Sequence, residues 1–283
     1  MRWRSRRRSD NVVDRRGMRM RGAKPALGIT GILVIGAVAL LFGADPLEVI
    51  SLMSKQAPVN TRVENSAQQG AKPKNDTAKA FVSTILASTE DTWREILKEK
   101  GANYQEPKLV LFTGEVSSAC GYTSAAVGPF YCPGDYQVYL DLSFFNELAK
   151  MGAVGDFAAG YVIAHEVGHH VQNILGVISQ VQKAKSKLSK VEANALQVRV
   201  ELQADCFAGV WGYFANIKHK MLEGGDLEEG LAAATAVGDD TMQKRAGQRV
   251  QPDGFTHGSA AERVHWFKRG FSSGDLDACN TFS

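Results

Sequence analysis

The sequence predicts an α+β protein that is predominantly helical, contains a small sheet and is preceded by one transmembrane helix. Three observations predict this class. An uncharged stretch covers residues 25–44. Three later segments carry apolar residues at helical spacing, and short runs of β-branched and aromatic residues lie between the first and second of them. At 283 residues the chain is long enough for one sizeable domain with an appendage.

Residues 1–24 are strongly basic. They hold ten cationic residues and two acidic ones, a net charge of +8, whereas the whole chain carries +3 and the remainder therefore −5. The basic pI is thus a property of this head alone, and the folded body gives no support for nucleic-acid binding. We expect no nucleic-acid partner.

Residues 25–44 are predicted to cross a membrane once. Twenty helical residues span about 30 Å, the thickness of the hydrocarbon core. The cations before them predict a cytoplasmic N-terminus, an inner-membrane anchor and an external C-terminal domain. A cleaved signal peptide is the alternative. It is disfavoured because the stretch is long and because Phe42 stands where a signal-peptidase site before Asp45 needs a small residue. Residues 45–75 are predicted to form a juxtamembrane segment, helical at 46–53, and a polar linker.

A domain is predicted at residues 76–283. Residues 76–100 carry an amphipathic helical pattern that ends at Gly101. Strands are predicted at 108–112 and 136–142, with Phe130–Tyr131 as a third strand or hairpin partner. The edge strand of such a sheet can hydrogen-bond an extended peptide, although a purely structural sheet is the alternative.

The segment Phe157 to Leu175 is a predicted buried helix that contains the pattern H-E-x-x-H. His165 and His169 lie one turn apart, so both imidazoles can bind one metal ion, and Glu166 can reach a water on that metal. A core helix with hydrogen-bonded histidines is the alternative. His170 is rotated by about 100° from His169, so we expect it outside this site, behind a ligand or at the surface.

A second predicted helix, Ala193 to Lys218, supplies acidic residues. Glu201 and Asp205 are four apart and face the same way, and such like charges repel unless a cation lies between them. We therefore predict Glu201 as the third metal ligand and Asp205 as the carboxylate that orients one histidine. The alternative is a solvated acidic pair. The competing third ligands are His219, His257 and His265.

All four cysteines follow residue 119, which is typical of an oxidising compartment. Cys120 and Cys132 flank a loop rich in glycine and proline. A bond between Cys206 and Cys279 would tie the predicted helix that carries Glu201 to the C-terminal tail. Four cysteines allow three pairings, and the sequence does not select one. A zinc-binding set is disfavoured because no C-x-x-C spacing exists, and Cys206 as an unpaired thiol stays open.

H-E-x-x-H followed by E-x-x-A-D resembles the gluzincin metallopeptidases, especially the CAAX prenyl endopeptidases and the related membrane stress proteases. Residues 165–170 and 201–209 are more similar still to a bacterial family, the putative neutral zinc metallopeptidases. Further likeness to that family lies in three segments, residues 118–121, 128–133 and 138–141. The resemblance covers residues 76–283 and, with the head and anchor, the whole chain. It implies a zincin-like domain, Zn²⁺ as cofactor and peptide hydrolysis.

The resemblance extends to residues 256–263. Prenyl endopeptidases carry Thr-His-Pro-Pro with an arginine six residues after the histidine, and His257 and Arg263 keep that spacing, although Gly258 and Ser259 replace the prolines. It implies that His257 or Arg263 stabilises the oxyanion of the tetrahedral intermediate. The alternative is a helix start, with residue 256 or 259 as the N-cap.

The sequence thus predicts a membrane-anchored zinc metalloendopeptidase with a protein or peptide substrate, in which Glu166 is the general base. A catalytically silent, zinc-stabilised scaffold that binds an envelope partner is the alternative from a different class. A third possibility is a zinc hydrolase that acts on a non-peptide amide bond.

Overall fold

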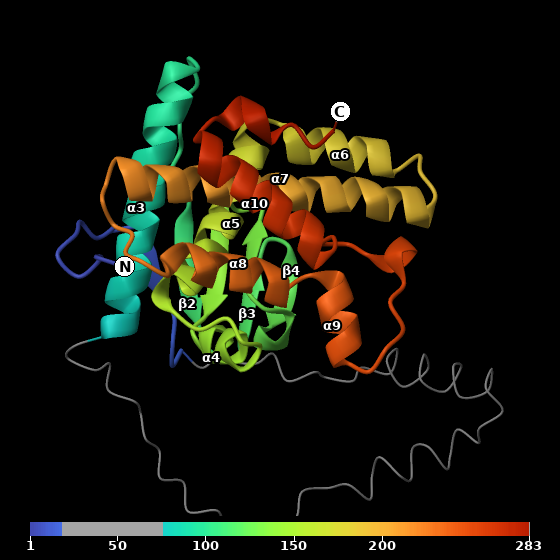
Figure 1. The fold of residues 1–283 in the computed structure, drawn as a ribbon, viewed down its shortest axis with the longest axis horizontal. Coiled ribbons are helices and arrows are strands. Elements are labelled where there is room, and N and C mark those ends of the chain that lie inside the picture. Colours follow the sequence, from blue (N-terminus) through green and yellow to red (C-terminus); the bar gives the residue numbers. More distant parts are fainter. Residues whose placement is uncertain (19–75, 283) are drawn as a thin grey trace, which may run out of the picture. The chain divides into compact units, whose positions relative to one another are not determined.

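The computed structural model describes residues 1–18 and 76–282 (Figure 1). Contacts divide the chain into two compact units, residues 1–17 with 72–283 and residues 18–71. The predicted span at 25–44 and the predicted segments at 46–53 and 54–75 lie outside the described residues. None of the helices within the described ranges combines the length and apolar composition needed to cross a membrane.

Helices dominate the first unit. The α-helices are α3 (Thr77–Glu99), α4 (Ser143–Lys150), α5 (Asp156–Ile174), α6 (Val177–Lys185), α7 (Lys190–Ile217), α8 (Asp226–Ala236), α9 (Asp239–Arg245) and α10 (Ala260–Ser273). Short 3-10 turns are η1 (Ala125–Val127), η2 (Pro252–Gly254) and η3 (Leu276–Cys279). The predicted helices at 76–100, 157–175 and 193–218 are confirmed as α3, α5 and α7.

The strands form two small sheets. They are β1 (Val12–Asp14), β2 (Lys108–Phe112), β3 (Glu115–Ser118), β4 (Gly121–Ser124), β5 (Phe130–Cys132) and β6 (Gln137–Asp141). The larger sheet has the order β1-β2-β6-β5, with β5 antiparallel to β6 and the other pairs parallel. The predicted strands at 108–112 and 136–142 are therefore confirmed, and Phe130–Tyr131 lies on an edge strand. The hairpin of β3 and β4 is separate and was not predicted.

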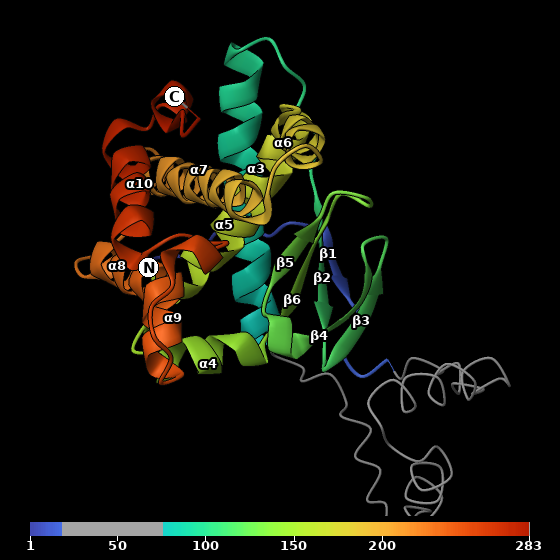
Figure 2. The ribbon, with the colours of Figure 1, turned by 90° about the vertical axis from the view of Figure 1, so that its right-hand side faces the viewer.

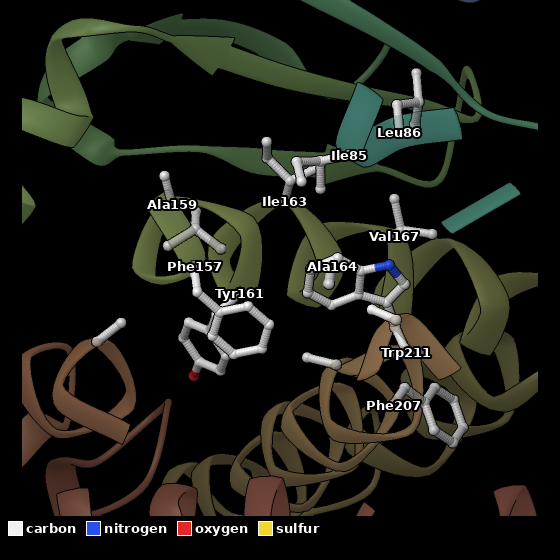
Figure 3. Packing of buried hydrophobic residues seen from close by; sticks show 14 of the residues in the cluster. Ile85, Leu86, Phe157, Ala159, Tyr161, Ile163, Ala164, Val167, Phe207 and Trp211 are labelled. Atoms are coloured by element: carbon white, nitrogen blue, oxygen red, sulfur yellow. The ribbon is translucent and has the colours of Figure 1, made fainter. Parts of the chain in front are cut away.

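Helix α5 lies between the larger sheet and α7 (Figure 2). Ile163 points toward the strands, while Trp211 and Phe207 of α7 face α5 from the opposite side (Figure 3). The rings of Phe157 and Trp211 stack with centroids 5.5 Å apart, and both side chains are fully buried. Residues on all sides of α5 are therefore in the core, as its nearly continuous apolar sequence predicts.

Helix α10 packs closely on α7 through glycine (Figure 1). A Cβ on Gly209 would lie 2.1 Å from the carbonyl oxygen of Phe267, and one on Gly270 would lie 1.9 Å from that of Cys206. Only glycine permits this separation. The contact fixes the start of α10, and therefore Arg263, relative to α7.

Both disulfides considered from the sequence are present, Cys120–Cys132 and Cys206–Cys279. The first ties the end of β5 to the turn between β3 and β4. The second ties α7 to η3 in the C-terminal tail and closes a loop of 73 residues. A bond that closes a loop of this length removes chain entropy from the unfolded state, worth on the order of 2–4 kcal/mol.

Residues 1–17 are part of the domain. Strand β1 pairs with β2, with Val12 opposite Leu109. The Trp3 side chain is 6% exposed, packs edge-on against Phe81 at 5.3 Å, and donates from Nε1 to Asp156 Oδ2 at 3.1 Å. This segment thereby supplies both an edge strand and a core residue.

Residues 1–24 were predicted to form a separate cytoplasmic head, and for residues 1–17 the prediction of a separate segment is wrong. The charge difference that suggested a head is partly neutralised within the domain: Arg7 Nη2 lies 3.0 Å from Glu90 Oε2 and 2.8 Å from Asp91 Oδ1. A single crossing at 25–44 would place residues 1–17 and 76–283 on opposite sides of a membrane. The pairing of β1 with β2 is not compatible with that topology.

Candidate functional site

The site forms where α5 and α7 cross at close range. A Cβ on Gly168 would lie 3.0 Å from the carbonyl oxygen and 3.2 Å from the Cα of Ala204. Glycine at this point lets the two backbones touch, which brings the His165 side of α5 against the Glu201 side of α7.

Three predicted ligands converge here. His165 Nε2 lies 3.3 Å and His169 Nε2 3.4 Å from the same oxygen, Glu201 Oε2. One ligand atom from each residue lies within 4.8 Å of the other two. The side chains of His165 and Glu201 are buried and that of His169 is 14% exposed, so the cluster opens to solvent on one side.

The second nitrogen of each imidazole has an acceptor. His165 Nδ1 lies 2.8 Å from Asp205 Oδ1, and His169 Nδ1 lies 2.9 Å from Gln172 Oε1. With a metal ion bound, each Nδ1 would keep its proton and each Nε2 would present its lone pair to the centre of the cluster. Two neutral imidazoles and one carboxylate, with one side open, are the donor set of catalytic zinc sites, so the residues fit Zn²⁺.

Asp205 lies at the centre of a buried network. It accepts hydrogen bonds from the Tyr161 hydroxyl at 2.5 Å, from Arg263 Nε at 2.8 Å and from Arg263 Nη2 at 3.0 Å, in addition to that from His165. Burial alone would raise the pKa of Asp205, but the charges of Arg263 and His165 outweigh it and lower the pKa to about 2. The carboxylate is therefore an anion that orients His165.

The pKa values of the histidines and of Glu201 are shifted by the charges that they place on one another. Burial alone lowers the pKa of His165, but Asp205 and Glu201 raise it to about 9. Burial alone would raise the pKa of Glu201, whereas His169 and His165 hold it well below its usual value. A carboxylate this close to two imidazoles favours a positive charge at the centre of the cluster, whether protons or a metal ion supply it.

The cluster lies at the wall of a cleft of about 480 Å³. Glu166 lines this cleft beside His165 and His169, and no described residue forms a hydrogen bond with its carboxylate. Most of the other lining side chains are apolar: Val127, Phe130, Phe144, Met151, Val162, Val237 and Met242. The edge strand β5 contributes residues 130–131 to the wall.

His257 lies in the same cleft and is held by Asp239 at the start of α9. Asp239 Oδ1 lies 3.2 Å from His257 Nδ1, and Asp239 Oδ2 accepts from the backbone N–H groups of Thr256, His257 and Gly258 at 2.7, 2.7 and 3.0 Å. The hydrogen bond with Asp239 raises the pKa of His257. Gly258 has φ +93, which a proline cannot adopt, so the loop follows a different path from a Thr-His-Pro-Pro segment.

Arg263, predicted with His257 as a group that stabilises the oxyanion, lines the same cleft but is surrounded by acceptors. Its side chain is 4% exposed, and its N–H groups point to Asp205, to the Tyr161 hydroxyl at 3.2 Å and to the Val237 carbonyl at 3.1 Å. These acceptors hold Arg263 behind His165. Ser259 is the N-cap of α10 in a capping box with Glu262, so the helix-start alternative is confirmed for that residue.

The other histidines lie elsewhere. His170 is fully buried rather than at the surface; its Nε2 donates to the Gln105 carbonyl at 2.6 Å, and its Nδ1 accepts from the Tyr131 hydroxyl at 3.1 Å. It therefore joins α5 to β5 and to the loop before β2. The competing ligands His219 and His265 are outside the metal-type clusters found among the described residues.

Sequence reasoning missed Tyr161, Gln172, Asp239 and Gln197. Gln197 Nε2 donates to Glu201 Oε1 at 2.9 Å and so fixes the second oxygen of that carboxylate. Tyrosine and glutamine carry no spacing signal, although Gln172 and Gln197 each lie one turn from a predicted ligand on the same helix.

A second acidic group, Asp156 with Asp226 and Glu229, was also unpredicted. The Met1 amino group forms ion pairs with Asp156 and Asp226.

Comparisons with known proteins identify the family of the chain. The sequence model of the family described as "putative neutral zinc metallopeptidase" matches residues 1–282. The uncharacterized protein YpfJ of Escherichia coli is 47% identical over 291 residues, which cover 100% of this chain and 99% of the relative. An uncharacterized protein of Mycobacterium tuberculosis is 40% identical over 263 residues, 87% of this chain and 85% of the relative.

No solved structure shows a significant match. The family model spans nearly the whole chain, and the relatives align over most of their own length. A zinc metallopeptidase family implies Zn²⁺ as the cofactor. The chain belongs to the putative neutral zinc metallopeptidase family.

Proposed function

We propose that the protein is a zinc-dependent endopeptidase in which His165, His169 and Glu201 hold the metal and Glu166 is the general base. The observation that carries this proposal is the convergence of both Nε2 atoms on Glu201 Oε2 at 3.3 and 3.4 Å, with Glu166 beside them in one cleft. Zinc, when bound, would polarise a water and the scissile carbonyl.

The remaining steps belong to the protein. Glu166 takes a proton from the attacking water on a carboxylate oxygen and delivers it to the departing amine nitrogen. Asp205 and Gln172 keep the Nδ1 protons of the two histidines in place, so both imidazoles stay oriented through the reaction. His257, protonated with the help of Asp239, donates to the oxygen that becomes negative.

Peptide substrates are favoured by the shape of the cleft. Strand β5 lies at the edge of its sheet (Figure 2). Residues 128–131 line the cleft, so an extended peptide can add to that edge beside the proposed metal ligands. The apolar wall, to which Phe144 and Met242 contribute, favours a bulky apolar side chain next to the scissile bond.

A peptide library tests this proposal. We expect cleavage next to bulky apolar residues, loss of cleavage after chelation, and recovery with added Zn²⁺. Met242→Lys should reduce cleavage of the preferred sequences by introducing an unpaired charge at the apolar wall. Absence of cleavage in a broad library with zinc fully bound would favour the scaffold alternative.

A further inference from the structure

The two histidine ligands are oriented by different groups. His165 relies on the carboxylate of Asp205, whereas His169 relies on a neutral amide, Gln172 Oε1, at 2.9 Å. Gln172 is completely buried on α5, one turn after His169. An amide can face a histidine with either its oxygen or its nitrogen, so something must fix its direction.

Backbone carbonyls fix that direction. Gln172 Nε2 donates to the carbonyl of Val200 at 2.7 Å and to Gln203 Oε1 at 3.0 Å, and Gln203 Nε2 donates to the carbonyl of Cys279 at 3.0 Å. Because a carbonyl only accepts, each amide must turn its NH₂ group toward it. The oxygen of Gln203 then faces Gln172, and the oxygen of Gln172 faces His169.

The far end of this chain of hydrogen bonds is the C-terminal tail. The disulfide with Cys206 attaches Cys279 to α7. The Thr281 hydroxyl donates to the Arg199 carbonyl at 2.6 Å, which holds the next part of the tail along the same helix. The carbonyl that orients Gln203 thus belongs to the tail, and these two contacts hold the tail on α7.

We propose that Gln172 and Gln203 are positioning residues that couple the disulfide-bonded C-terminal tail to the ligand His169, so that zinc affinity depends on the tail. Loss of the Cys206–Cys279 bond releases the Cys279 carbonyl, Gln203 loses its fixed direction, and His169 loses part of its orientation. This inference rests on the proposed ligand set but does not require peptidase activity.

Zinc affinity of the full chain, measured by competition with a chelator, tests the coupling. We expect Gln172→Ala to weaken Zn²⁺ binding by roughly ten- to a hundredfold, the usual effect of removing a group that orients a ligand. Gln203→Ala should weaken it several-fold. The matched control Gln180→Ala removes an exposed glutamine of α6 and should leave the affinity unchanged.

The double variant Gln172→Ala/Gln203→Ala distinguishes a relay from two independent effects. In a relay the second change adds little, because Gln203 acts on His169 only through Gln172. Multiplication of the two effects, or an affinity for Gln172→Ala within twofold of the wild type, would overturn the proposal. Lower thermal stability with unchanged zinc affinity would show a structural role alone and would equally overturn it.

The disulfide gives an independent arm of the test, which stands even if a glutamine variant fails to fold. Cys206→Ser/Cys279→Ser should weaken Zn²⁺ binding, whereas the control Cys120→Ser/Cys132→Ser, which also removes one disulfide, should not. Equal zinc affinities for the two double variants would contradict the coupling. If none of these proteins nor the wild type binds zinc, the ligand assignment fails instead.

Discussion

The Nδ1 atom of His165 lies 2.8 Å from Oδ1 of Asp205, and Arg263 binds the same carboxylate from the other side through Nε at 2.8 Å. All three side chains are buried. The proposed ligand His165, the anion that orients it and the cation that stabilises the anion therefore form one unit, drawn from α5, α7 and α10.

Replacing Asp205 should weaken metal binding and lower the stability of the fold. In Asp205→Asn the Arg263 charge loses its partner in a buried position, which should cost about 3–5 kcal/mol of unfolding free energy. Zinc affinity should fall by roughly ten- to a hundredfold. Denaturant unfolding and chelator competition measure the two effects. The control Asp277→Asn removes an exposed pair with Lys100 and should cost at most about 1 kcal/mol.

The pH dependence of cleavage should report His257. Its hydrogen bond with Asp239 raises its pKa, so the protonated form persists to a higher pH than in a free imidazole and is lost as the pH rises through the raised value. In Asp239→Asn the pKa falls, and the alkaline limb of the kcat/KM profile should move to lower pH. His257→Ala should lower kcat by about a hundredfold to a thousandfold. An alkaline limb that stays in place in Asp239→Asn would show that another group sets it.

The N-terminal segment should contribute strongly to stability. Trp3 is buried against Phe81, so Trp3→Ala should cost about 3–5 kcal/mol of unfolding free energy. The exposed neighbour Ser5 provides a control, and Ser5→Ala should be within about 0.5 kcal/mol of the wild type. Equal stabilities for the two variants would mean that the segment does not dock in solution.

Because the N-terminal segment is packed in the domain, we predict that residues 1–17 and residues 76–282 lie on the same side of any membrane. Single cysteines introduced at the exposed positions Ser5 and Asp253 should respond alike to a membrane-impermeant thiol reagent in intact cells, because β1 pairs with β2. Lysed cells give the reference labelling. Labelling at only one of the two positions would instead support a single membrane crossing between residues 5 and 253.

The elements that carry the strongest periodicity could be predicted from the sequence. Helix α5 and the spacing of His165, Glu166 and His169 follow from a local pattern, and so does the pair Glu201 and Asp205 on α7. The mostly helical class with a small sheet was predicted for the same reason. These features depend on residues one helical turn apart, which a sequence shows directly.

The features that depend on distant contacts could not be predicted. Strand β1 has three residues within a basic segment, and its pairing with β2 depends on a contact about a hundred residues away. Asp239 precedes His257 by 18 residues. The direction of the Gln172 amide is set by the Val200 carbonyl and, through Gln203, by a carbonyl in the C-terminal tail. No local pattern encodes such partners, because tertiary packing selects them.

Peptide hydrolysis by Glu166→Gln, compared with the wild type at equal zinc content, tests the central claim most directly. Glutamine is close in size to glutamate and leaves His165, His169 and Glu201 unchanged, so zinc should remain bound, but an amide cannot act as the general base. We expect cleavage to fall by at least about a hundredfold, the lower end of a general-base contribution. Equal cleavage by the two proteins, each with zinc bound, would contradict the mechanism.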